Sequence, residues 1–130
     1  MKLFIIGAAG RTGQEIVQQA LARDHDLTAF VRSPESMAIT NDRLTVLTGN
    51  AVEEKQLFGA MQNHDAVISA LGPREPFKPS SLLRDSALAT TQGCDRAAET
   101  SSKGRWRREI AIGVPHVYRL YYRHCHRRRR

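Results

Sequence analysis

Seven residues near the start of the chain, GAAGRTG at positions 7–13, have the types and spacing that hold a phosphate group. Gly7 allows a sharp turn out of a strand, Gly10 lets backbone approach a ligand, and Gly13 lets a helix pack closely on a sheet. The first amides of that helix and its positive dipole end form an anion site that needs no lysine. The alternative is a glycine-rich turn that binds nothing. We expect a dinucleotide pyrophosphate to be bound by Gly7, Ala9, Gly10, Arg11, Thr12 and Gly13.

The segments on either side of this turn predict the elements that position it. Residues 3–6 are an apolar run typical of a buried strand, and residues 13–21 carry apolar side chains at helical spacing on one face. A second strand is expected at 27–31, closed by Ser33 and Pro34. Together these segments predict a βαβ unit of about 30 residues.

The residue that follows the second strand favours one cofactor over another. NAD-binding sites usually place Asp or Glu about 20 residues beyond the glycines, where the carboxylate binds the ribose hydroxyls. This chain has Arg32 there, and a guanidinium can bind a 2′-phosphate with two hydrogen bonds. Arg11 would approach from the opposite side. The sequence therefore favours NADP(H) over NAD(H), although Arg32 is also compatible with a solvated charge at a strand end.

Two further repeats extend the pattern. Strands are expected at 43–48 and 65–71, with a helix at 52–61 between them. Ligands of open parallel sheets bind beyond the carboxyl ends of the strands, so Asn50 and Ala51 are expected to line the same crevice as the glycine turn, with Asn50 near the adenine. Ala70, Leu71 and Gly72 are expected beside the ribose or nicotinamide. Gly49 and Gly72 are equally compatible with ordinary strand-end turns. The fold class predicted is α/β with a doubly wound parallel sheet.

A proline-rich segment interrupts the pattern after the fourth strand. Residues 73–79 contain three of the five prolines, which predicts a loop that acts either as a flap over the nicotinamide or as a connector. Ser80 and Ser81 offer an N-cap for a helix that begins near Leu82.

Five segments together resemble a known family: KLFIIGAAGRTGQEIVQQAL, FVRSPE, LTGNA, DAVISALG and SLLRDSALATTQ. They resemble atypical short-chain dehydrogenases of the NAD(P)H-binding kind, and most of all the biliverdin reductase B, flavin reductase-like and NmrA-like proteins. The resemblance covers residues 1–92. It implies a Rossmann fold, NADPH binding through the glycine turn and Arg32, and hydride transfer to a flavin or another small conjugated acceptor. In some relatives the fold only senses the redox state of the cofactor.

Residues 93–130 depart from that family. Residues 1–92 have nine Lys and Arg against ten Asp and Glu, whereas residues 93–130 have eleven against three. We therefore predict a Rossmann domain at 1–92, incomplete relative to the family, and an Arg-rich segment at 93–130. Three origins remain open: a truncated or frame-shifted product, a disordered basic extension, or a nucleic-acid-binding tail in which arginines alternate with Trp106, Tyr118, Tyr121 and Tyr122.

Candidates for catalysis and metal binding are few. The Tyr and Lys four residues apart that typical short-chain dehydrogenases use are absent, so no catalytic residue is named. His124, Cys125 and His126 are adjacent, which suits a metal poorly, and no metal is expected. His25 and His64 precede strands and are expected to be solvated.

Length and edges set the remaining expectations. The apolar run at 3–6 is too short for a membrane span and does not suit a signal peptide, so a cytoplasmic location is expected. If residues 109–114 do not form a fifth strand, the strand at 66–71 becomes an apolar edge and favours a dimer. The function predicted is an NADPH-dependent oxidoreductase or a truncated relative, with a non-catalytic NADP(H) sensor and a nucleic-acid-binding protein as alternatives.

Overall fold

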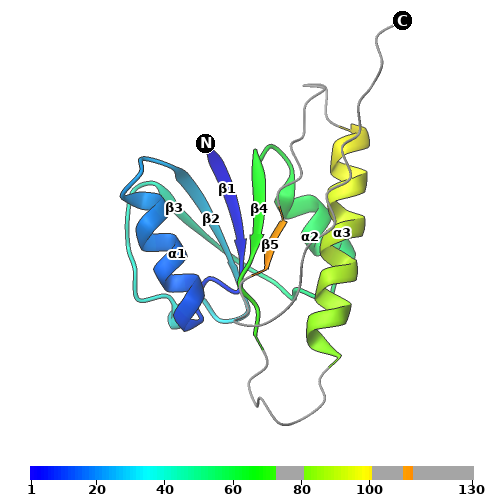
Figure 1. Cartoon of the computed structure of the whole chain (residues 1–130), viewed down its shortest axis with the longest axis horizontal. Helices are drawn as coiled ribbons and strands as arrows, with labels where there is room; N and C mark the ends of the chain where they lie inside the picture. Colours follow the sequence, from blue (N-terminus) through cyan, green and yellow to red (C-terminus); the bar gives the residue numbers. More distant parts are fainter. Residues whose placement is uncertain (73–80, 101–109, 113–130) are drawn as a thin grey trace, which may run out of the picture.

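The chain forms a parallel sheet with helices on both faces (Figure 1). The computed structural model describes residues 1–72, 81–100 and 110–112. The five strands lie in the order β3-β2-β1-β4-β5, and every neighbouring pair is parallel. In chain order the elements are β1 (Lys2–Ile6), α1 (Arg11–Leu21), β2 (Asp26–Val31), the 3-10 turn η1 (Pro34–Ser36), β3 (Leu44–Thr48), α2 (Glu54–Met61), β4 (Ala66–Ser69), α3 (Leu82–Thr100) and β5 (Ile110–Ile112).

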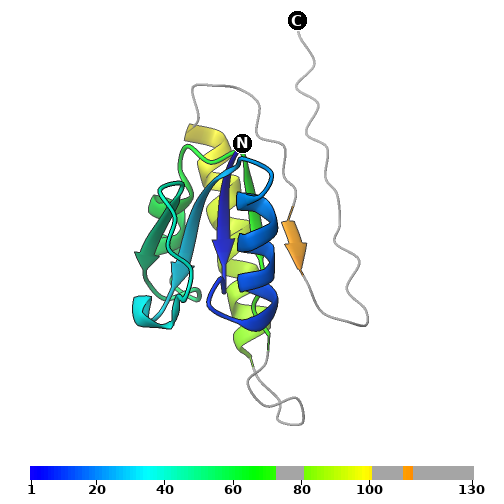
Figure 2. The same cartoon turned by 90° about the vertical axis from the view of Figure 1, so that its left-hand side faces the viewer.

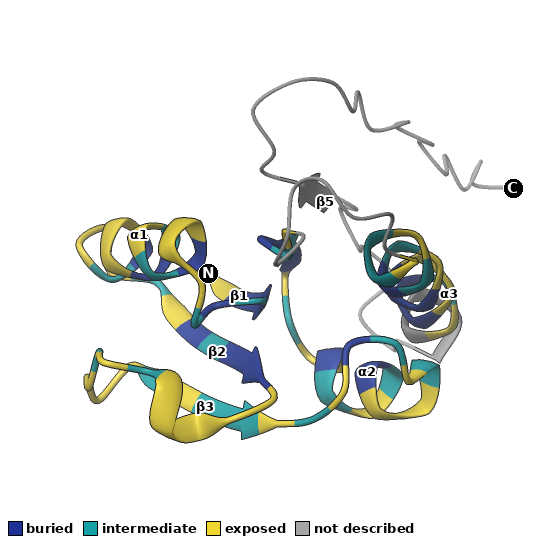
Figure 3. Cartoon of the chain, turned by 90° about the horizontal axis from the view of Figure 1, so that it is seen from below, coloured by how far each residue is buried: buried dark blue, intermediate teal, exposed yellow. Residues whose placement is uncertain are grey.

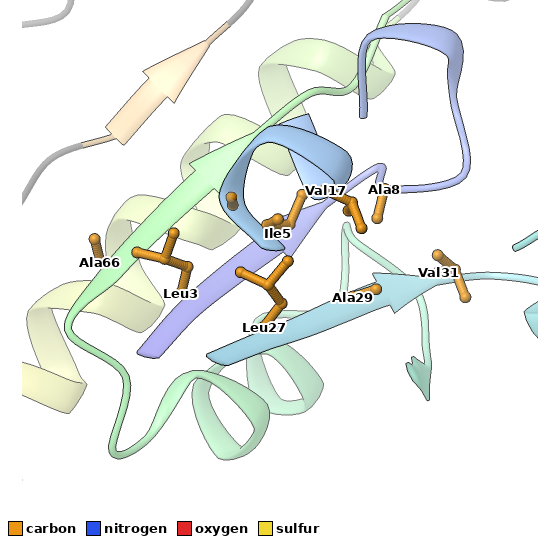
Figure 4. Close-up of a cluster of buried hydrophobic side chains, with 9 residues drawn as sticks. Leu3, Ile5, Ala8, Val17, Leu27, Ala29, Val31 and Ala66 are labelled. Atoms are coloured by element: carbon orange, nitrogen blue, oxygen red, sulfur yellow. The ribbon is translucent and has the colours of Figure 1, made fainter. Parts of the chain in front are cut away.

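Strand β1 is the centre of the core because it is buried on both faces. Leu3 and Ile5 pack under α1 with Val17 of that helix (Figure 4). Phe4 and Ile6 point to the opposite face, where α2 and α3 lie (Figure 2). This alternation follows from the two-residue period of a strand, and it explains why residues 3–6 are all apolar. Figure 3 shows the exposed residues of α1 on the side away from the sheet.

The strand order places a switch point beside β1. The chain moves outward from β1 through β2 to β3, and then returns to the other side of β1 to form β4. The carboxyl ends of all four strands meet at one edge, since Ile6 is in register with both Phe30 and Ser69, and Val31 with Thr48. Sheets of this kind bind ligands at such an edge. The predicted doubly wound parallel sheet is confirmed.

Element boundaries differ from the sequence predictions by up to two residues. Helix α2 begins at Glu54 and not at 52, because the turn at Asn50 accepts the amide of Glu53 before the helix starts. Strand β4 ends at Ser69 and not at 71, because Ala70 and Leu71 pass directly over Gly7.

Helix α3 continues beyond Gln92, the last residue of the resemblance. Cys94 is buried, and its Sγ lies 3.8 Å from Sδ of Met61 in α2. Arg96 pairs with Glu54 of α2 at 2.8 Å. The helix therefore packs on the rest of the fold through residue 96. The division of the chain after Gln92 stays a prediction.

Strand β5 changes the expectation of an exposed apolar edge. Its residues Ile110 and Ile112 are in register with Val67 and Ser69 of β4. Strand β4 is therefore paired on both sides. A free edge was expected only if residues 109–114 formed no strand, and that condition is not met, so the structure gives no support for a dimer through this edge.

Several predictions fall on residues outside the described ranges. These are the loop at 73–79, the arginine and aromatic residues proposed to bind nucleic acid, and His124 to His126. Within the described ranges, no helix is both long enough and apolar enough to span a membrane.

Candidate cofactor-binding site

A cleft of about 680 Å³ opens at the carboxyl edge of the sheet. Its walls come from the residues that follow β1, β2, β3 and β4, together with Leu82 at the start of α3. This volume lies within the range of small-molecule and cofactor sites. The strand order thus gathers four separate strand ends around one cavity.

The glycine turn lines the cleft through Gly7, Ala9 and Gly10. Two glycines of this turn, Gly7 and Gly13, leave no room for a side chain. Gly7 has φ of +77°, and a Cβ there would lie 3.0 Å from the backbone of Ala70 and Leu71. At Gly13 a Cβ would lie 2.2 Å from the carbonyl oxygen of Gly7. The first glycine allows the turn and the last allows α1 to pack against it.

The N-terminus of α1 is open to an anion. Gly10 is the N-cap and has no side chain to accept the first amides, and the first turn holds no acidic residue. The turn is rigid, since Gly10 N–H donates to Gly7 O at 3.1 Å and Gln14 Nε2 donates to Ala9 O at 3.0 Å. Helix geometry leaves the first amides without carbonyl partners, so they remain for a phosphate.

Arg32 is the one charged residue among the described residues that line the cleft. It follows β2, it is exposed, and it has no hydrogen bond or ion pair within the part of the chain that the structure describes. Ser33 and Ser36 line the cleft beside it, and Ser36 Oγ donates to the carbonyl oxygen of Ser33. The Ser36 hydroxyl hydrogen is used in that bond, so this corner offers a phosphate the Arg32 guanidinium and the Ser33 hydroxyl as donors. No carboxylate lies among the described lining residues.

The end of β3 forms the next wall. Gly49, Asn50 and Ala51 line the cleft, and Asn50 Oδ1 accepts the N–H of Val52 at 3.2 Å. A Cβ on Gly49 would lie 2.2 Å from the ring of Phe30. A side chain at 49 would require the Phe30 ring to shift, so close packing favours glycine there. The sequence position alone is equally compatible with a ligand contact and with an ordinary strand-end turn.

The opposite end of the cleft is apolar. Ala70 is buried, Leu71 is half-buried, and Leu82 faces them from α3. Gly72 is exposed at the rim, and a Cβ there would meet nothing within 4 Å. No charged side chain among the described residues lines this end, so it suits an uncharged ring.

Eight of the predicted cofactor residues line the cleft together. They are Gly7, Ala9, Gly10, Arg32, Asn50, Ala70, Leu71 and Gly72. Arg11 and Thr12 are exposed outside the cleft lining, and Gly13 is buried beneath the turn.

Five residues of the lining were not anticipated: Phe30, Val31, Ser33, Ser36 and Leu82. Four of them lie close in sequence to a strand end already assigned to the site. Ligands of open parallel sheets bind beyond the carboxyl ends of the strands, and this rule is sufficient to place these residues near the site. Leu82 had no such signal, because it enters the cleft from a helix that follows a long loop.

The described lining contains no group suited to proton transfer near neutral pH. Its polar side chains are Arg32, Ser33, Ser36 and Asn50. His64 lies elsewhere, with Nε2 2.8 Å from Thr28 Oγ1 and its ring edge-on to Phe4. The expectation that His64 is solvated is wrong, since it is half-buried and burial lowers its pKa below 6.5. What the cleft itself offers is binding and orientation.

Fold and cleft together define a dinucleotide-binding domain of the Rossmann type. The backbone cradle that excludes side chains, the uncapped helix terminus and the size of the cleft all fit a nicotinamide dinucleotide. A family described as NAD(P)H-binding matches residues 7–128, and the chain belongs to that family.

Individual proteins resemble this chain over part of its length. The chain is 34% identical over 71 residues to the photosystem II assembly factor Ycf39 of Synechocystis sp., covering 54% of this chain and 22% of that protein. It is 34% identical over 77 residues to the uncharacterized protein YwnB of Bacillus subtilis, covering 55% of this chain and 32% of that protein. The solved structure of the oxidoreductase ylbE from Lactococcus lactis superposes with a TM-score of 0.65 at 22% identity, over 86% of this chain and 47% of that chain.

These likenesses differ in what they show. The structural match has low identity and shows the shared fold. The chain spans less than a third of the length of the two curated relatives. It is therefore an NAD(P)H-binding domain, and the activity of a whole protein is a matter for proposal.

Proposed function

We propose that this chain binds NADP(H) in preference to NAD(H) and forms the cofactor-binding part of an NADPH-dependent oxidoreductase. The observation that carries the proposal is Arg32, an exposed guanidinium without a partner among the described residues, at the β2 end of a cleft whose described lining has no carboxylate. The 2′-phosphate of NADP(H) would neutralise the charge of Arg32, and no carboxylate in the described lining would repel that phosphate.

This assignment orients the dinucleotide across the sheet. With the 2′-phosphate at Arg32, the adenosine lies over the β2 and β3 ends, and the pyrophosphate lies over Gly10 at the N-terminus of α1. The nicotinamide then lies at the β4 end, beside Leu71 and Leu82. Residues proposed to hold the cofactor are thus Gly7, Ala9, Gly10, Arg32, Asn50, Ala70, Leu71 and Gly72, with the first-turn amides of Arg11, Thr12 and Gly13.

Bound NADPH would supply a hydride to an acceptor. The described lining includes no side chain suited to donate or accept a proton near neutral pH. The role of these residues is therefore to bind the dinucleotide and orient it. The acceptor we propose is a flavin or a similar conjugated ring, which takes up hydride without a dedicated protein acid. Support for a flavin comes from the sequence resemblance to flavin reductase-like proteins.

A non-catalytic NADP(H) sensor is the second candidate. The observation that favours it is the same lack of a proton-transfer group among the described lining residues. In that case the chain binds the dinucleotide through the same residues but turns nothing over.

Two experiments separate these proposals. NADPH and NADH are titrated against the wild type and Arg32→Glu, and we expect tight NADPH binding that the substitution abolishes while NADH binding is kept. Equal affinity for both nucleotides, unchanged in Arg32→Glu, would contradict the NADP(H) preference. NADPH oxidation with FMN or riboflavin then tests the reaction: turnover supports the oxidoreductase, and binding without turnover supports the sensor.

A further inference from the structure

Ser33 is an exposed serine at the β2 corner of the cleft. It is the N-cap of η1, a position where a serine oxygen usually accepts a backbone N–H, yet its side chain makes no capping hydrogen bond. The N–H and the hydroxyl of Ser36 both donate to the carbonyl oxygen of Ser33 instead. Within the described part of the chain, the Ser33 hydroxyl therefore has no hydrogen-bond partner.

The segment around Ser33 is open to another enzyme. Every residue from Arg32 to Ser36 is exposed. The backbone at Ser33 is extended, with φ of −131° and ψ of 106°, because the ring of Pro34 disfavours the helical conformation for the residue that precedes it. An exposed, extended segment presents the Ser33 hydroxyl to a modifying enzyme as well as to a ligand in the cleft.

Arg32 makes this corner attractive to a phosphate that is attached to the chain. Its guanidinium is exposed, lines the same cleft and has no partner among the described residues. Glu35, the acidic residue closest in sequence, lies outside the lining. A phosphate on Ser33 would carry about two negative charges and three acceptor oxygens, and such a group forms charge-assisted hydrogen bonds with a neighbouring guanidinium.

We propose that Ser33 is a phosphorylation site, and that phosphoserine at this position occupies the anion site at Arg32 and excludes NADP(H). The inference rests on the proposed function, which places the 2′-phosphate of the dinucleotide at Arg32. The attached phosphate and the 2′-phosphate would repel each other, and one guanidinium cannot neutralise both. NADH has a hydroxyl in place of the 2′-phosphate and is not repelled in this way. Phosphorylation therefore removes the preference for NADP(H).

The modification requires ATP and a protein kinase. The Ser33 oxygen forms a bond to the γ-phosphorus of ATP, and the bond from that phosphorus to the β–γ bridging oxygen breaks. ADP leaves with the bonding electron pair, and the hydroxyl proton passes to the catalytic base of the kinase. Ser36 also lines the cleft, but its hydroxyl donates within the turn. Ser33 is therefore the better acceptor of the phosphoryl group.

Phosphoserine introduced at position 33 during translation tests the effect on binding. Calorimetric titration of the full chain should show NADPH binding at least about thirtyfold weaker than in the unmodified protein, and NADH affinity changed by less than about threefold. Retained NADH binding also shows that the modified chain is folded.

The control for this measurement is Thr40, which is exposed and lies outside the cleft lining. Phosphoserine in place of Thr40 adds the same charge and should leave NADPH affinity within about threefold, because salt screens a charge outside the cleft. Unchanged NADPH affinity with phosphoserine at 33, an equal loss for NADPH and NADH, or an equal loss at positions 33 and 40 would overturn the inference.

Mass spectrometry follows the phosphorylation itself. The full chain is incubated with ATP and a kinase that acts on serines followed by proline, and Ser33 should gain phosphate whereas Ser36 should not. NADPH at ten times its dissociation constant should slow the reaction about tenfold, because only the free protein presents the hydroxyl. The protein purified from the cells that produce it should carry the same phosphate. Phosphate on Ser36 alone, no phosphate on Ser33, or a reaction that NADPH does not slow contradicts the assignment.

Failure of the proposed function gives a different result. If the unmodified chain binds neither nucleotide, or binds NADPH and NADH equally, the proposed function is wrong. If the unmodified chain prefers NADPH and phosphoserine at 33 leaves that preference intact, the proposed function stands and this inference alone is wrong.

Discussion

Gly13 of α1 lies directly against Gly7 of the β1–α1 turn, so that a Cβ on Gly13 would be 2.2 Å from the carbonyl oxygen of Gly7. Backbone cannot yield as a flexible side chain can, and Gly13→Ala should push the start of α1 away from the sheet. We expect a loss of about 1–3 kcal/mol in the free energy of unfolding. NADPH binding should weaken as well, because the first-turn amides move. Urea unfolding and calorimetric titration measure the two effects.

The same substitution in α2 is the control for this prediction. A Cβ on Gly59 would meet nothing within 4 Å, and alanine favours a helix over glycine by about 0.5–1 kcal/mol. Gly59→Ala should therefore stabilise the protein and leave NADPH binding intact. Stabilisation by Gly13→Ala would show that the turn is not closely packed.

The two arginines near the cleft should differ in their effect on cofactor choice. Arg32 lines the cleft, whereas Arg11 is exposed outside its lining. Arg32→Ala should weaken NADPH binding about tenfold and leave NADH binding unchanged, because the guanidinium interacts with the 2′-phosphate. Arg11→Ala should weaken NADPH binding by less than about threefold, since salt screens an exposed charge that lies outside the cleft lining. A larger effect at Arg11 than at Arg32 would place the phosphate elsewhere.

Stability should fall in mildly acidic solution because of His64. Burial is the main cause that lowers the pKa of His64 below 6.5 in the folded protein, and the backbone carbonyls of Met61 and Gln62 oppose that shift. Between the folded and the unfolded pKa the unfolded chain binds more protons, so stability rises with pH there. The contribution is complete above pH 6.5 and is lost as the pH falls through the folded pKa.

The histidine prediction has a direct measurement. NMR titration of the His64 imidazole should give a pKa below 6.5, and His64→Gln should reduce the slope of unfolding free energy against pH in this window. A midpoint at or above 6.5 would contradict burial of the ring against Phe4 and Thr28.

Arg96 should contribute measurably to the packing of α3 on α2. It pairs with Glu54 at 2.8 Å, with side chains 54% and 34% exposed, and its guanidinium lies 4.9 Å from the centre of the Phe58 ring. We expect Arg96→Ala to lower the free energy of unfolding by about 1 kcal/mol, from a partly exposed ion pair and a cation–π contact.

The control for Arg96 lies on the same helix. Arg84 is 78% exposed, and its ion pair within the described part of the chain is with its neighbour Asp85, so Arg84→Ala should cost less than about 0.5 kcal/mol. Equal losses of unfolding free energy in Arg96→Ala and Arg84→Ala would show that the part of α3 beyond Gln92 adds little to the stability of the fold.

Local signals in the sequence were sufficient for the α/β architecture. The strand at residues 3–6 is apolar at every position, and a strand buried on both faces by helices requires this pattern. The spacing of Gly7, Gly10 and Gly13 marked the turn. In the structure, a φ of +77° restricts position 7 to glycine, and the close approach to the carbonyl oxygen of Gly7 restricts position 13. Arg32 and Asn50 could be assigned to one cleft because carboxyl ends of parallel strands meet at one edge.

Tertiary packing decided what adjacent residues of one turn do. The glycine pattern predicts that Gly13 packs α1 on the sheet, and the structure buries it there. Arg11 and Thr12 of the same turn are exposed outside the cleft lining, which the pattern did not reveal. Phe4 of β1 and Thr28 of β2, which contact the His64 ring, are far away along the chain, so the burial of His64 had no local signal. The hydrogen bond from the N–H of Asn50 to Oε1 of Gln56 likewise joins the end of β3 to α2, and the sequence carried no signal for it. Periodicity identifies elements and strand ends, whereas the side chains that share a cleft depend on how those elements pack.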